Sequence, residues 1–150
     1  MAKAIIIGFG NPLRGDDGLG QRAAEVLEEE FAGADVEVRS CHQLTPEIAE
    51  PVSRTEVAVF IDAAEDQPPG EFRCRRLEPS ARTPTSFAHA LDPEAVLAVA
   101  HALYGHCPDA ALLSVGGERF EHGEGLSAAV EGALPAVLDM ARSIIEEHGG

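Results

Sequence analysis

The sequence predicts an α/β fold, a three-layer α/β/α arrangement around a mostly parallel, twisted sheet of about five strands. Short apolar runs, typical of buried strands, alternate along the chain with longer segments whose apolar residues recur at helical spacing. Strands that alternate with helices pair in parallel and are covered on both faces, with right-handed crossovers. At 150 residues, 45% of them hydrophobic, the chain is long enough for one conventional core. We therefore expect a single domain over residues 1–150.

The first half of the chain predicts the order strand, helix, strand, helix, strand. Residues 3–7 and 57–61 are apolar runs of buried strands, and residues 36–38 form a short alternating strand. Between the first two strands, residues 19–31 carry apolar side chains at helical spacing among several glutamates. Thr45, followed by a proline, is typical of the start of the second helix.

The second half adds a half-exposed or edge strand, a helix, another strand and a long final helix. Residues 71–78 alternate charged and apolar side chains, as a half-exposed strand or an edge strand does. Asp92, placed before a proline, predicts a helix start and leads to an apolar strand at residues 110–115. In the final helix, residues 126–145, the apolar residues fall on one face, with Ser127 near the N-cap.

The charge of the chain limits the kinds of partner that it can bind. The chain has 26 acidic and 11 basic residues and a net charge of −15, so phosphate backbones and anionic membrane surfaces would repel it. No stretch approaches the ~20 apolar residues of a membrane span, and the apolar N-terminal run is too short for a signal peptide. Three widely spaced cysteines predict no disulfide framework. We expect a cytoplasmic protein that binds neither nucleic acid nor membrane.

A glycine-rich turn with two acidic residues follows the first strand. Residues 8–20 contain five glycines and the adjacent pair Asp16 and Asp17, just ahead of the first helix. A dinucleotide-binding turn would have a third glycine where Leu13 stands, and two carboxylates at the helix entry would repel a pyrophosphate. A divalent cation, or a water molecule to be activated, suits these carboxylates better.

Two later residues are candidates for the same edge of the sheet. Asp62 comes directly after the strand at residues 57–61, and His89 lies in the loop before the third helix. Ligands of open α/β sheets bind at the carboxyl ends of the strands, where these side chains would meet Asp17. Two carboxylates and an imidazole suit a first-row divalent ion such as nickel or zinc, with open coordination positions. The two carboxylates could equally share the role of general base.

Each of these residues also has a purely structural explanation. Asp16 or Asp17 would serve as a helix cap, and Asp62 would accept backbone N–H bonds in a turn. His89 alone would be a surface histidine, and His42, which follows the second strand, is a further polar residue near the same edge. Only the occurrence of these residues together favours a functional site.

The pattern Gly-x-Gly-Asn-x-x-x-x-Asp-Asp-Gly-x-Gly at residues 8–20, followed in order by Asp62 and His89, resembles that of the nickel–iron hydrogenase maturation endopeptidases. The resemblance implies a protease that removes a C-terminal extension from a hydrogenase large-subunit precursor after nickel insertion. It implies that the nickel in the precursor is the recognition element and that the protease has no resident cofactor. By the same resemblance, Asp17, Asp62 and His89 reach that nickel and act in cleavage, while Asp16 and Asn11 shape the loop.

Two other classes of function stay open from the sequence. A metal-binding or metal-delivery protein without hydrolytic activity could hold nickel or zinc with the same three side chains. A small-ligand domain could cradle an anion in the glycine loop, against which the two aspartates argue. The chain lacks the Gly-x-Ser-x-Gly, phosphate-loop and His-Glu-x-x-His motifs, so serine hydrolases, nucleotide hydrolases and thermolysin-like proteases have no support.

Overall fold

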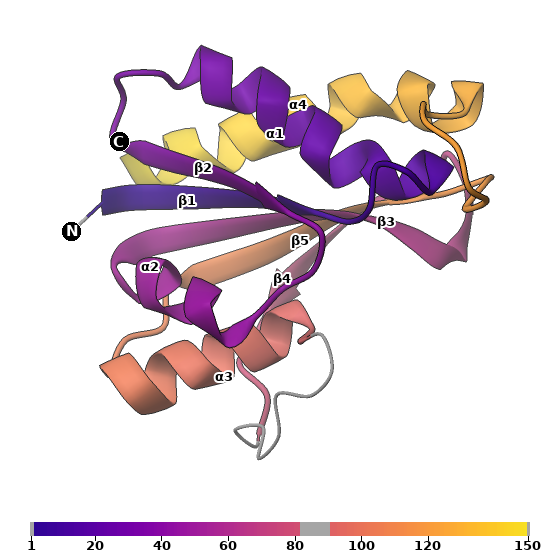
Figure 1. Ribbon diagram of the computed structural model, residues 1–150. Coiled ribbons are helices and arrows are strands. Elements are labelled where there is room, and N and C mark those ends of the chain that lie inside the picture. Colours follow the sequence, from indigo (N-terminus) through magenta and orange to yellow (C-terminus); the bar gives the residue numbers. More distant parts are fainter. Residues whose placement is uncertain (1, 82–90, 150) are drawn as a thin grey trace.

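The computed structural model describes residues 2–81 and 91–149, and it confirms the predicted α/β class (Figure 1). Its core is a five-stranded sheet with the strand order β2-β1-β3-β5-β4. The elements in chain order are β1 (Ala2–Phe9), η1 (Gly15–Gly18), α1 (Leu19–Glu30), β2 (Val36–Cys41), η2 (Pro46–Ile48), α2 (Ala49–Ser53), β3 (Thr55–Pro69), β4 (Phe72–Leu77), α3 (Pro93–Tyr104), β5 (Asp109–Gly116) and α4 (Ala128–Gly149).

The sheet is parallel except at one edge. β1 pairs in parallel with both β2 and β3, and β3 pairs in parallel with β5. β4 lies antiparallel to β5 at the edge of the sheet, and four consecutive residues of this strand are exposed. Of the two interpretations of the alternating residues, a half-exposed strand or an edge strand, the structure thus contains the edge strand.

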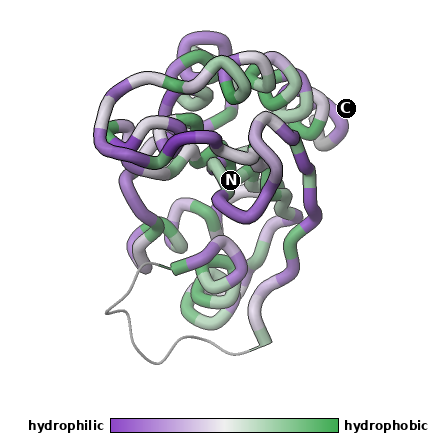
Figure 2. Tube along the Cα trace, turned by 90° about the vertical axis from the view of Figure 1, so that its right-hand side faces the viewer, coloured by the Kyte–Doolittle hydropathy of each residue, from purple (hydrophilic) through white to green (hydrophobic). Residues whose placement is uncertain are grey.

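Helices cover both faces of the sheet, as Figures 1 and 2 show from perpendicular directions. α1 and α4 pack on one face, where Ile6, Leu27 and Val137 belong to one buried cluster. α2 and α3 pack on the other face, where Ile5 and Val96 belong to a second cluster. Neighbouring residues of β1 thus point into different cores, which explains why its sequence is continuously apolar. Among the helices of the described residues, none has the length and apolar character needed to cross a membrane.

The helix starts follow the chemistry that the sequence predicts, with small shifts. The Asp92 side chain accepts a hydrogen bond of 2.8 Å from the N–H of Ala95 and caps α3. The final helix begins at Ala128, because the Ser127 hydroxyl accepts the N–H of Val130 at 3.4 Å and so stands at the cap. The second helical segment begins as the 3-10 helix η2 directly after Thr45, although the Thr45 side chain makes no capping bond.

The expected position of Asp62 after the end of a strand is wrong, because β3 continues to Pro69. β1 pairs with β3 only as far as Ile61, whereas β5 continues to pair with Asp62 and the two residues that follow it. Hydrogen bonding to β5 therefore keeps the chain extended beyond the point where β1 has ended. As a result Asp62 lies inside β3, at the first position beyond the last pairing with β1.

Candidate functional site

Two glycines place the start of α1 directly against the carboxyl edge of the sheet. A Cβ atom on Gly8 would lie 1.8 Å from the carbonyl oxygen of Gly20, and a Cβ on Gly20 would lie 2.5 Å from that of Ile61. Neither gap accommodates a side chain, so the first turn of α1 lies on the backbones of β1 and β3. This contact brings the acidic turn η1 next to Asp62.

Asp17 lies in η1 with a half-buried side chain, and it ties the loop back on itself. Its Oδ2 accepts a hydrogen bond of 2.8 Å from the backbone N–H of Asn11. Gly10 has a φ of +137° and lies so close that an added Cβ would be 2.1 Å from the Asp17 carbonyl oxygen. The alternative of Asp17 as a helix cap is wrong. The N-cap residue of α1 is Gly18, and no side chain makes a capping hydrogen bond at this helix start.

Asp62 lies close enough to Asp17 for the two charges to interact. Burial and, after it, the negative charge of Asp17 raise the pKa of Asp62 to about 7, while the N–H of Ala63 acts in the opposite direction. The structure thus brings together two of the three candidate site residues, one from the loop after β1 and one from β3. A nearby cation would stabilise the charged form of a carboxyl group whose pKa is raised in this way, and would lower that pKa.

Asp16, next to Asp17 in the sequence, is fully buried and faces the other way. Its carboxylate accepts the backbone N–H groups of Glu118, Arg119 and Ser127 and the hydroxyl of Ser127, at 2.6–2.9 Å. Burial raises the pKa of Asp16, but these four hydrogen bonds outweigh it and hold the pKa below its usual range. Asp16 is therefore not a helix cap.

The carboxylate of Asp16 instead joins η1 to the loop between β5 and α4. The backbone continues this connection, because the N–H of Asp16 donates to the carbonyl oxygen of Arg119 at 2.8 Å and that of Gly15 to Gly123 at 2.7 Å. Sequence reasoning placed Asp16 correctly in the shaping of the loop but missed its partners. Ser127, at the start of the last helix, can be recognised as a partner of Asp16 only after the fold is known.

The third candidate, His89, lies outside the described residues. Within residues 2–81 and 91–149, no three histidine, cysteine, aspartate or glutamate side chains are grouped to hold a metal ion. His42 is exposed just after β2. The described part of the site therefore consists of two carboxylates, which is fewer than a closed structural metal site needs.

A polar pocket of about 440 Å³ adjoins Asp62. Besides Asp62 it is lined by side chains of β5 and β4, among them Ser114, Arg73 and Arg75. The Ser114 hydroxyl donates a hydrogen bond of 2.6 Å to Gln67 Oε1, which fixes part of the lining. Sequence reasoning missed this pocket, because only the strand register brings these residues together.

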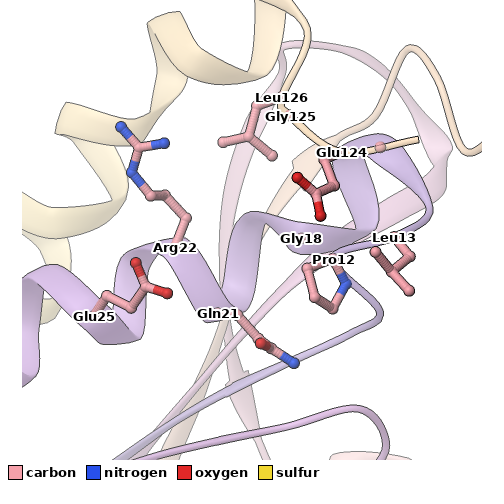
Figure 3. Close-up of a pocket in the computed structure, with 10 residues that line it drawn as sticks. Pro12, Leu13, Gly18, Gln21, Arg22, Glu25, Glu124, Gly125 and Leu126 are labelled. Atoms are coloured by element: carbon pink, nitrogen blue, oxygen red, sulfur yellow. The ribbon is translucent and has the colours of Figure 1, made fainter.

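A second hollow, of about 260 Å³, lies on the other side of the glycine loop. Figure 3 shows it between the start of α1 and the segment before α4, with the side chains of Arg22, Glu25 and Glu124 around it. Neither Asp17 nor Asp62 lines it. With two carboxylates against one guanidinium, it does not suit an anion, which weakens the hypothesis of an anion-cradling glycine loop further.

The chain has the fold of the hydrogenase maturation endopeptidases. It matches the hydrogenase maturating endopeptidase HybD from E. coli with a TM-score of 0.79 and 24% identity, over 98% of this chain and 94% of that one. It matches the nickel–iron hydrogenase maturation protease HycI from Thermococcus kodakarensis with a TM-score of 0.73 and 23% identity, over 99% and 94%. A hydrogenase 2 maturation peptidase from a Thaumarchaeota archaeon gives a TM-score of 0.71 and 23% identity, over 95% and 97%.

No protein-family model matches the chain, and no curated protein matches it either. At 23–24% sequence identity, the similarity to these solved structures defines the fold of the chain. It extends over nearly the whole chain, and the glycine-rich loop and Asp62 lie at the carboxyl edge of the same kind of sheet.

Proposed function

We propose that this chain is an endopeptidase that removes the C-terminal extension of a nickel–iron hydrogenase large-subunit precursor after nickel has been inserted. Solved structures with this fold are named as hydrogenase maturation endopeptidases, and the pattern at residues 8–20 resembles that of the family. The observation that carries the proposal is the carboxyl pair Asp17 and Asp62 at the carboxyl edge of the sheet, where burial and, after it, the charge of Asp17 raise the pKa of Asp62 to about 7. In this proposal the nickel is part of the substrate.

The carboxylate pair suits a metal ion that arrives with another molecule. Each carboxylate supplies oxygen ligands, and a divalent cation between them would replace the proton that Asp62 otherwise holds near neutral pH. Two protein ligands, or three with His89, leave coordination positions for groups of the precursor. Binding is then strong only when metal and precursor are present together, so the nickel acts as a checkpoint for cleavage.

Cleavage itself needs an activated water molecule. Its oxygen adds to the carbonyl carbon of the scissile peptide bond, the C–N bond breaks, and the released amine takes up a proton. A deprotonated carboxylate can accept the proton of this water, and a metal ion can lower the pKa of a bound water. With no cation bound, the pKa of Asp62 is about 7, which suits a general base near neutral pH; a bound cation lowers this pKa, and activation of the water then belongs to the ion.

The test is to incubate the purified protein with a matched large-subunit precursor, with and without nickel, and to determine the C-terminal mass of the precursor. We expect shortening of the nickel-loaded precursor alone. Asp17→Asn and Asp62→Asn should abolish the shortening, whereas Asp139→Asn, which changes an exposed carboxylate of α4, should leave it intact.

Failure of cleavage would contradict the proposal only if the precursors are matched and loaded. No shortening with several such precursors, combined with tight binding of free nickel by calorimetry, would support the metal-delivery alternative instead. His89→Ala should weaken cleavage of the loaded precursor, and unchanged cleavage would remove His89 from the site.

A further inference from the structure

The polar pocket beside Asp62 runs across three strands in register. Asp62 of β3 is paired with Ser114 of β5, which is paired in turn with Arg73 of β4. All three residues line the pocket. Neighbouring strands lie about 4.8 Å apart, so this row extends about 10 Å from the carboxylate pair to the edge of the sheet.

The alternation of the edge strand gives Arg73 and Arg75 a shared face. Leu77, which follows at the same period, belongs to the buried cluster under α3, so both arginines lie on the α3 side of the sheet with Asp62. Arg76 has the opposite orientation and lines a different pocket, next to α4. Positive side chains on an edge strand discourage pairing with other chains, and this role is enough to explain Arg76. Arg73 and Arg75, in contrast, line the pocket that contains Asp62.

The pocket has two halves of opposite charge. Asp62, Glu65 and Asp66 supply carboxylates on β3, and Arg73 and Arg75 supply guanidinium groups on β4. In a chain with 26 acidic and 11 basic residues, two arginines on one wall of a pocket are a local exception.

Neighbouring carboxylates hold both arginines without using all their donors. Arg73 is paired with Glu71 through Nε and Nη2, and Arg75 with Glu94 of α3 through Nη1 at 3.1 Å. A guanidinium carries five N–H groups, so each arginine can bind a further carboxylate.

We propose that this pocket is a substrate subsite in which Arg73 and Arg75 bind a carboxylate of the extended precursor segment next to the scissile bond. The inference rests on the proposed function, since it takes Asp17 and Asp62 as the point of cleavage. An extended chain advances about 3.3 Å per residue, so the 10 Å row corresponds to about three residues from the scissile bond. The carboxylate belongs either to an acidic side chain at that distance or to a C-terminus.

Labelled peptides test the subsite directly. Fluorescein-labelled peptides with the cleavage-region sequence of the precursor and an amidated C-terminus carry glutamate or glutamine about three residues from the scissile bond. A third peptide keeps the glutamine but ends there with a free carboxylate. Fluorescence anisotropy with nickel added should show about fivefold tighter binding of the wild type to a peptide with the carboxylate, and this preference should shrink as salt is added. Tighter binding of the glutamate peptide would identify the carboxylate as an acidic side chain, and tighter binding of the peptide with the free end would identify it as a C-terminus.

Matched variants decide whether the arginines are responsible. Arg73→Gln should bind all three peptides equally, and Arg75→Gln should reduce the preference. Arg54→Gln should retain it in full, because Arg54 is an exposed arginine paired with Glu50 outside the pocket. Circular dichroism confirms that each variant is folded. Equal or undetectable binding of all peptides by the wild type would overturn the proposal, and so would an unchanged preference in Arg73→Gln.

Cleavage of nickel-loaded precursor by the same preparations separates this inference from the proposed function. If the wild type cleaves but shows no carboxylate preference, the subsite is refuted and the protease function stands. If the preference depends on Arg73 but no matched, nickel-loaded precursor is cleaved, the pocket is a peptide-binding site and the protease function is refuted.

Discussion

Replacing Asp62 with asparagine should stabilise the fold at alkaline pH while abolishing function. Burial and the charge of Asp17 raise the pKa of Asp62 to about 7, against 3.8 for an ordinary aspartate. Between pH 4 and pH 7 the unfolded chain has lost this proton while the folded chain still holds it. Because the folded state then binds more protons than the unfolded state, the free energy of unfolding decreases as the pH rises through this window.

The magnitude follows from the separation of the two pKa values. About three pH units at about 1.4 kcal/mol per unit corresponds to about 4 kcal/mol of stability lost by pH 8. Asparagine has nearly the same volume and no charge, so Asp62→Asn avoids this loss. The variant should equal the wild type below pH 4, where both states of Asp62 are protonated, and exceed it most above pH 7.

Urea unfolding followed by circular dichroism at pH 4, 6 and 8 measures this difference. Asp17→Asn should recover a smaller part of the stability at pH 8, because the charge of Asp17 is the second cause of the raised pKa. Asp139→Asn, in an exposed pair with Arg142, serves as the control for a generic loss of negative charge. The reasoning is refuted if Asp62→Asn is no more stable than the wild type at pH 8, or if the control gains as much.

Three further predictions concern the loop and the helices. Asp16→Ala should lower the free energy of unfolding by about 3 kcal/mol in urea titrations, since four donors lose their acceptor, two of them in buried hydrogen bonds from Ser127; a loss under 1 kcal/mol would contradict that role. Gly8→Ala should cost about 3 kcal/mol or more, measured in the same way, because its Cβ would overlap the Gly20 carbonyl. Gly132→Ala is its counterpart in α4, where nothing lies within 4 Å of the new Cβ, and should gain about 0.5–1 kcal/mol; similar effects at both glycines would refute the close-contact argument.

The fold could be predicted from the sequence because its signals are local. Apolar runs, helical periodicity and cap residues such as Asp92 depend on neighbours a few positions away, and they determine the order of elements. The alternating segment at residues 71–78 indicated a half-exposed or edge strand, and its strand, Phe72–Leu77, lies at the edge. The length of β3 escaped prediction, since its continuation to Pro69 depends on pairing with β5, far along the chain.

The candidate site was predictable only in part for the same reason. Asp17 and Asp62 follow from the rule that ligands bind at the carboxyl edge of the sheet, and the structure places them together there. The hydrogen-bond partners of Asp16 could not be predicted, because they are more than a hundred residues away in the sequence. Arg73 likewise enters the pocket only through the register of three strands.

The tight contact between Gly8 and Gly20 has a consequence for other chains that carry the same pattern. The glycines set how closely the helix approaches the sheet, and this requirement is the same whatever reaction takes place nearby. A chain that keeps them but has lost the equivalent of Asp17 should therefore still fold, and under the proposed function it would have no activity. A sequence search with the glycine positions alone would return such inactive homologues together with active enzymes. Only the acidic positions would separate the two groups.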